Sequence, residues 1–118
     1  MKMLVFVLND VTLLDRVVEA YAEAGIPGAT ILDSEGMGRF LANEVPLFAD
    51  FKEVIKGSPS GNKTLLAVVN DSAAVDRLTP ILREVVGDLD KPGNGILFTV
   101  PVDWIAGRAR LETEEGQR

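Results

Sequence analysis

The sequence predicts a single α+β domain in which strands and helices alternate as two strand–helix–strand halves. Four short apolar runs are separated by two segments whose apolar residues recur at helical spacing. The chain has 118 residues, a length that suits one domain and is too short for two ordinary ones. Its composition, 47% hydrophobic and 25% charged, is that of an ordinary globular protein.

The first half begins with a strand and a helix. Residues Lys2–Leu8 form an almost continuous apolar run, which is typical of a buried strand. Asp10 follows as a suitable helix N-cap, because its carboxylate can accept a hydrogen bond from an unpaired amide. Residues Val11–Ala24 carry apolar side chains at intervals of three and four, which predicts an amphipathic helix. Gly25 is expected to end this helix, and Pro27 prevents it from resuming.

A second strand is expected at Ala29–Leu32, and a long connection follows it. Residues Ser34–Arg39 include two glycines and show no periodicity, whereas Val45–Lys56 show the pattern of a short amphipathic helix. Residues Gly57–Asn62 are typical of a loop. About 28 residues, from 35 to 62, therefore separate two strands, and connections of this length in compact domains tend to be functional.

The second half repeats the order of the first. Residues Lys63–Val69 predict a third strand, and a second amphipathic helix follows from about Ser72 until Gly87 ends it. Pro80 lies inside this helix, so either the helix is kinked or Thr79 caps a new start.

A turn-rich loop at Asp88–Gly95 leads into the fourth strand, Ile96–Val100. This order predicts a ferredoxin-like βαββαβ sandwich, with a four-stranded antiparallel sheet and two helices on one face. The domain is expected at residues 1–106 and a flexible C-terminal tail at 107–118. No helix remains to cover the second face of the sheet, so we expect a homo-oligomer.

The composition argues against several classes of function. The chain has no cysteine and no histidine, which excludes disulfides, thiolate metal sites and a Ser-His-Asp triad. We therefore expect neither an enzyme nor a resident metal. The net charge of −6 disfavours nucleic-acid binding. The apolar start at Met1–Leu8 is too short to span a bilayer and lacks a cleavage site, so we expect a cytoplasmic protein without direct membrane insertion.

Three segments together resemble the nitrogen-regulatory P-II family. Residues Ala20–Thr30 (AYAEAGIPGAT) are similar to the family's ALAEAGIRGMT. Residues Glu35–Arg39 (EGMGR) are similar to the glycine-aromatic-glycine-arginine motif that opens the family's long T-loop. Residues Lys91–Val102 (KPGNGILFTVPV) resemble its nucleotide-binding B-loop and following strand, KIGDGKIFVLPV. The resemblance extends over residues 2 to 106 and is closer to a divergent P-II-like signalling protein than to a true P-II protein.

This resemblance implies a homotrimer with adenine nucleotides bound in clefts between subunits. It also implies that residues 35–62, as a T-loop, regulate a partner, either an enzyme or a membrane transporter. Glycines let backbone amides approach a phosphate, and cations neutralise its charge. Carried over by position, the resemblance implies these nucleotide-binding residues: Thr30, Gly36, Gly38, Arg39, Lys91, Gly93 and Gly95. Arg108 is also expected to bind the nucleotide, because it lies one residue from the position of a phosphate-binding arginine near the end of the family's domain. The expected partner-docking residues are Phe48, Phe51 and Ile55.

Departures from the family pattern shape the expected ligand. Phe40 stands where true P-II proteins have a glutamine that binds 2-oxoglutarate and magnesium, and the two late arginines align with Gly107 and Ala109. With fewer cations available, we expect AMP or ADP rather than ATP.

Other interpretations remain open. Gly36-Met37-Gly38 by itself is typical of a turn, and the apolar residues of 45–56 can simply pack against the body of the protein. A trimeric divalent-cation-tolerance protein, a small enzyme on the same scaffold and a trimer with a decayed ligand site are the alternatives. Four carboxylates could bind a hard cation, although their spacing matches no known metal loop: Asp33, Glu35, Asp88 and Asp90.

Overall fold

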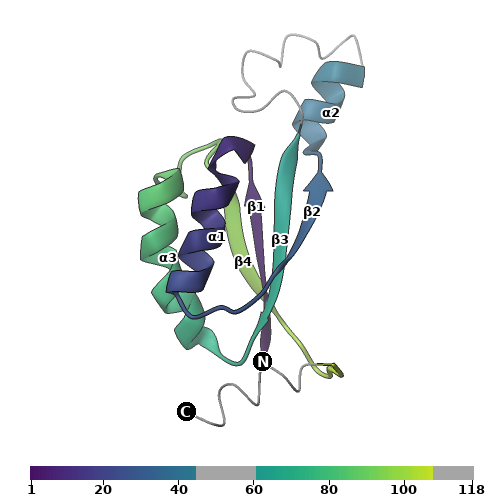
Figure 1. Cartoon of the computed structure of the whole chain (residues 1–118). Helices are drawn as coiled ribbons and strands as arrows, with labels where there is room; N and C mark the ends of the chain where they lie inside the picture. The colour runs from purple at the N-terminus through teal and green to yellow at the C-terminus, as the bar shows by residue number, and fades with distance from the viewer. Residues whose placement is uncertain (45–60, 108–118) are drawn as a thin grey trace.

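The computed structural model of this chain is an α+β domain, and it describes residues 1–44 and 61–107 (Figure 1). The strands are β1 (Lys2–Leu8), β2 (Thr30–Ser34), β3 (Asn62–Val69) and β4 (Ile96–Pro101). The helices are α1 (Leu14–Glu23), which a short 3₁₀ turn at Val11–Leu13 precedes, α2 (Met37–Glu44) and α3 (Ser72–Val86).

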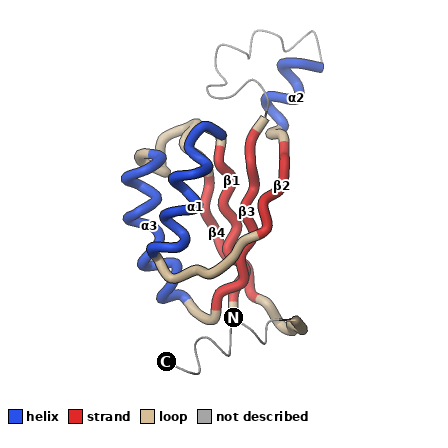
Figure 2. Tube along the Cα trace, in the orientation of Figure 1, coloured by secondary structure: helices blue, strands red, loops and turns tan. Residues whose placement is uncertain are grey.

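The four strands form one antiparallel sheet in the order β2-β3-β1-β4. At its centre Phe6 lies opposite Leu65 on one side and Leu97 on the other. Helices α1 and α3 pack side by side on one face of this sheet, and α2 projects from one end of it (Figures 1 and 2). The predicted four-stranded antiparallel sheet with two helices is therefore confirmed, and the arrangement is compatible with a ferredoxin-like fold.

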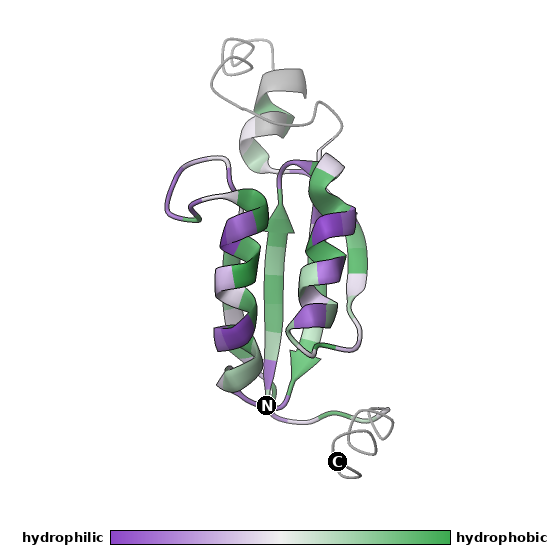
Figure 3. Ribbon diagram, turned by 60° about the vertical axis from the view of Figure 1, so that its left-hand side comes forward, coloured by the Kyte–Doolittle hydropathy of each residue, from purple (hydrophilic) through white to green (hydrophobic). Residues whose placement is uncertain are grey.

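The core lies between the sheet and the two helices. Alternate residues of β1 and β3 face the helices, because successive side chains of a strand point to opposite faces. Burying one large apolar side chain in this core contributes about 1.5–3 kcal/mol to the stability of the fold. Between α1 and α3, the strand behind them is hydrophobic over most of its length, whereas the loop after α3 is mostly hydrophilic (Figure 3). The largest fully buried side chains are Phe6, Leu4, Leu8, Leu65, Leu78, Leu82 and Val17.

Helix α1 ends in the way that the sequence predicts. Gly25 has a φ of +82°, and its amide donates to the carbonyl of Ala22 at 3.0 Å. The Ile26 amide donates to the carbonyl of Tyr21 at 2.9 Å, which completes a Schellman motif. The guanidinium Nε of Arg77 in α3 donates to the carbonyl of Ala24 at 2.8 Å, so α3 also stabilises the end of α1.

Helix α3 runs without interruption through Pro80, from Ser72 to Val86. The carboxylate of Asp71 caps it by accepting from the Ala73 amide at 2.9 Å. The hydroxyl of Thr79 donates to the carbonyl of Val75 at 2.7 Å. Thr79 therefore does not cap a new helix, and that alternative is wrong.

The connection after β2 differs from the prediction. Strand β2 ends at Ser34, two residues later than expected, and α2 occupies Met37–Glu44, a range that begins in a segment predicted to be irregular. The Phe40 amide donates to the Gly36 carbonyl at 2.9 Å, so Gly36 begins the first helical turn. Two helical turns that contain a glycine give no detectable periodicity in the sequence. The predicted helix at 45–56 lies outside the described residues.

None of the described helices has both the length and the apolar character needed to cross a membrane.

Candidate functional site

One end of the sheet brings together segments that are far apart in the sequence. Strands β1 and β2 end there, and β3 and β4 begin there, because neighbouring strands are antiparallel (Figure 1). Asn9, Ser34 and Asn62 consequently lie at the same end of the sheet as the Asp88–Gly95 loop.

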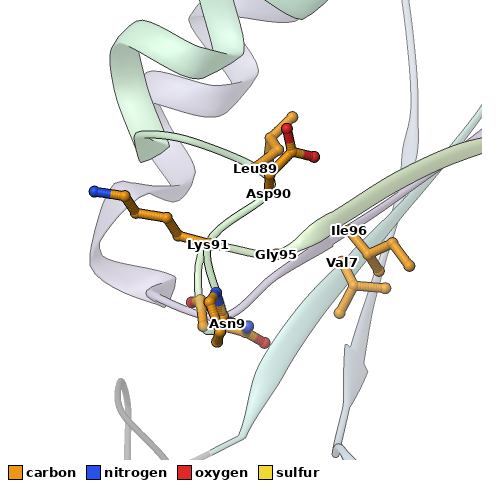
Figure 4. Close-up of a pocket in the computed structure, with 9 residues that line it drawn as sticks. Val7, Asn9, Leu89, Asp90, Lys91, Gly95 and Ile96 are labelled. Atoms are coloured by element: carbon orange, nitrogen blue, oxygen red, sulfur yellow. Dashed lines mark hydrogen bonds between the residues drawn. The ribbon is translucent and has the colours of Figure 1, made fainter.

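A pocket of about 360 Å³ lies between the Asp88–Gly95 loop and the adjoining ends of two strands (Figure 4). The loop contributes residues 89–93 and Gly95, β1 contributes Val7 and β4 contributes Ile96. Asn9, which follows β1, also lines the pocket. The lining therefore combines an apolar side, a side-chain amide and a glycine-rich loop backbone, a mixture that is typical of small-molecule sites.

Hydrogen bonds within the loop hold its shape. The carboxylate of Asp88 accepts from the Asp90 amide at 2.9 Å, and the carbonyl of Asp88 accepts from the Lys91 amide at 3.1 Å. The side-chain amide of Asn94 donates to the same carbonyl at 2.7 Å. A short polar residue thus closes each end of the loop, which gives the pocket a defined wall.

Gly95 is required by close packing. Its φ is +109°, and a Cβ atom at this position would lie 2.5 Å from the carbonyl oxygen of Val7 and 3.3 Å from the ring of Phe6. The loop backbone therefore reaches β1 only because residue 95 has no side chain.

The charges that line the pocket nearly cancel. Asp90 and Lys91 are its charged lining residues, and both are exposed. In Figure 4 the Lys91 side chain extends away from Val7 and Ile96. The ammonium group therefore lies away from the apolar side of the pocket, and that side suits an uncharged part of a ligand.

The pocket lies at the edge of the sheet face opposite the one on which α1 and α3 pack. Val7 and Ile96 are register partners, and both belong to this face together with Val5 and Phe98. Ile96 is 56% exposed and Phe98 is 43% exposed. Leu32 of β2, 44% exposed, is on the same face. An apolar face of this kind is typical of a subunit interface.

The structure brings together some of the predicted nucleotide-binding residues. Lys91, Gly93 and Gly95 line the pocket. Gly36 precedes α2, Gly38 is in its first turn, and neither is among the described residues that line the pocket.

The other predicted site residues are distributed as follows. Thr30 opens β2 and Arg39 lies in α2, so neither belongs to the loop that forms the pocket. Arg108, Phe48, Phe51 and Ile55 lie outside the described residues. The lining residues Val7, Asn9 and Ile96 were not predicted as site residues, because the pairing of β1 with β4 is needed to bring the end of β1 beside the loop.

Within residues 1–44 and 61–107, no three carboxylate side chains gather closely enough to hold a metal ion. Of the four candidate carboxylates, Asp33 forms an ion pair with Lys63. Asp88 holds the pocket loop, as described above. These two carboxylates therefore have structural roles.

Tyr21 is a buried group away from the pocket. Its side chain is 4% exposed, and no hydrogen-bond partner for its hydroxyl is found in the described part of the chain. Burial raises the pKa of Tyr21 above its ordinary value, because the low-dielectric surroundings disfavour the phenolate.

No protein-family model matches the sequence, and no curated protein shows significant similarity to it.

Proposed function

We propose that this protein is a P-II-like regulatory protein of the cytoplasm. In this proposal a homotrimer binds a small ligand of low charge, AMP or ADP, in clefts between its subunits. The ligand then controls how residues 35–62 engage a partner, which is an enzyme or a membrane transporter.

The observation that carries the proposal is the position of the pocket. Val7 and Ile96 belong both to the pocket lining and to the apolar sheet face opposite α1 and α3. A second subunit that packs on this face would add a wall to the open pocket, so assembly and ligand binding would depend on each other. This arrangement supports an intersubunit site of the P-II kind.

The lining supports a nucleotide of low charge. Val7, Leu89 and Ile96 offer apolar contacts suited to an adenine ring, and Asn9 offers a side-chain amide that can pair with base edges. Lys91 is the only cation among the lining residues of the described structure, and Asp90 lies next to it. One or two phosphates suit this balance better than three.

The base of the 35–62 segment supports a docking role. Met37 is 77% exposed and Phe40 is 47% exposed, and both lie in α2, which projects from the end of the sheet that holds the pocket. Exposed apolar side chains on a projecting element favour contact with another protein. The predicted docking residues Phe48, Phe51 and Ile55 belong to the same segment of the chain and lie outside the described residues.

Sedimentation and ligand screening test the proposal. We expect a trimer in analytical ultracentrifugation, and we expect AMP or ADP to raise the unfolding temperature more than ATP, cyclic AMP, 2-oxoglutarate or bicarbonate does. Lys91→Ala should reduce the effect, while Lys2→Ala, at the far end of β1, should leave it unchanged. A single sedimenting subunit together with no nucleotide response would refute the proposal. Stabilisation by divalent cations alone would support the cation-tolerance alternative.

A further inference from the structure

A row of polar side chains links the pocket to the place where the chain leaves the sheet and returns to it. Asn9 donates from Nδ2 to the carbonyl of Gly93, in the pocket loop, at 3.1 Å. Its Oδ1 accepts from Nδ2 of Asn62 at 3.4 Å. Asn62 in turn accepts at Oδ1 from the hydroxyl of Ser34 at 2.5 Å. Ser34 closes β2, Asn62 opens β3 and Asn9 follows β1, so the row links two strands and the end of a third to the loop.

The donors and acceptors of this row are consistent along its length. A serine hydroxyl has one proton, and Ser34 uses it toward Asn62. The contact of 2.7 Å between Ser34 and Thr64 must then have the Thr64 hydroxyl as donor. Each amide donates with Nδ2 and accepts with Oδ1, and all four side chains are half-buried. Polar groups in such surroundings hold one another in place, because losing one partner leaves the next unpaired.

Only Asn9 of this row touches the pocket directly. Gly93, which its amide holds, forms part of the pocket wall. Asn62 therefore acts on the pocket through Asn9, and Ser34 acts through Asn62. A Cβ atom at Gly36 would lie 3.8 Å from Nδ2 of Asn62, so the residue before α2 lies close to the same amide.

We propose that Ser34 and Asn62 are positioning residues for the pocket, although neither lines it. They fix the amide of Asn9, which fixes the carbonyl of Gly93 and with it the pocket loop. The identity of the ligand rests on the proposed function, but the positioning does not. Coupling between sites is reciprocal, so a ligand that moves the loop also acts on Ser34 and Asn62, where residues 35–61 depart and return.

The first test needs no ligand. Backbone hydrogen exchange of residues 88–95 is measured for the full chain, for Ser34→Ala and for Asn62→Leu, which is similar in size to asparagine. Loss of one hydrogen bond in the row should speed exchange in the loop by about fivefold. The matched control is Ser72→Ala, at the start of α3 and the opposite end of the sheet, and it should leave the loop unchanged. Unchanged loop exchange in both folded variants would overturn the proposal.

A double-mutant cycle then separates positioning from a general loss of stability. The exchange rates of the loop are compared in Asn9→Leu, Ser34→Ala and the combined variant. Ser34→Ala should have its effect only while Asn9 is present, because Ser34 has no other route to Gly93 in the row. If the two substitutions change the exchange rates independently, so that the combined variant shows the product of their separate effects, the proposal is overturned.

Titration with ADP tests the site and its positioning separately. We expect Ser34→Ala to weaken ADP binding by about fivefold, while Ser72→Ala leaves it unchanged. Loop exchange that responds to Ser34→Ala in a protein that binds neither AMP nor ADP supports the positioning and contradicts the proposed function. ADP binding that is equal in the wild type, Ser34→Ala and Asn62→Leu contradicts the positioning and leaves the proposed function intact.

Discussion

Replacing Gly95 by alanine should destabilise the fold through the contact of the pocket loop with β1. The new Cβ would lie 2.5 Å from the carbonyl oxygen of Val7, a distance that real Cβ atoms essentially never show. Both Val7 and Gly95 would have to move through their backbones, at the point where β4 pairs with β1. The positive φ adds about 1–2 kcal/mol, which is the cost of a left-handed conformation for a residue with a side chain. Together the two effects should lower the free energy of unfolding by about 3–4 kcal/mol. This is a large part of the free energy of unfolding of a typical domain, about 5–15 kcal/mol.

Gly93→Ala is the matched control for this prediction. Gly93 has a similar φ of +89°, but a Cβ there meets no atom within 4 Å. Gly93→Ala should therefore lower the free energy of unfolding only by the cost of the left-handed backbone, about 1–2 kcal/mol. Urea unfolding at one protein concentration measures both variants, since assembly makes stability depend on concentration. Equal destabilisation by the two substitutions would refute the argument from close packing.

Three further predictions concern the helices. Arg77→Ala should lower the unfolding free energy by about 1 kcal/mol, because the carbonyl of Ala24 loses its donor; urea unfolding that shows no change would contradict this. Asp71→Ala should cost about 1 kcal/mol through loss of the α3 N-cap, and Asp71→Asn, which keeps an acceptor oxygen, should restore most of it in the same assay. The raised pKa of Tyr21 means that the unfolded state releases the phenolic proton at a lower pH than the folded state does. The contribution of Tyr21 to the free energy of unfolding should therefore be fully present below about pH 10, the ordinary pKa of tyrosine. Above that pH the free energy of unfolding should decline by up to about 1.4 kcal/mol per pH unit. Tyr21→Phe should remove this part of the decline, and an identical pH profile for both proteins would show that Tyr21 is not the source.

The local features of this chain could be read from its sequence. The apolar run of β1, the stripe of α3 and the end of α1 at Gly25 all follow from patterns within a few residues. The order of these elements leaves few topologies, so the antiparallel sheet with two helices on one face was predictable as well. The turn-rich loop at Asp88–Gly95 was also recognisable from its composition.

Only the tertiary structure decided which residues gather around that loop. Val7 and Ile96 meet because β1 and β4 pair in one particular register, and a shift of β4 by one residue would turn Ile96 to the helix-covered face. Asn9 and Asn62 are 53 residues apart, and no local pattern links them. Helix α2 likewise gives no periodic signal, because two turns are too short to show one. Sequence patterns act over a few residues and determine the elements, whereas the site depends on contacts between strand ends that only the folded sheet brings together.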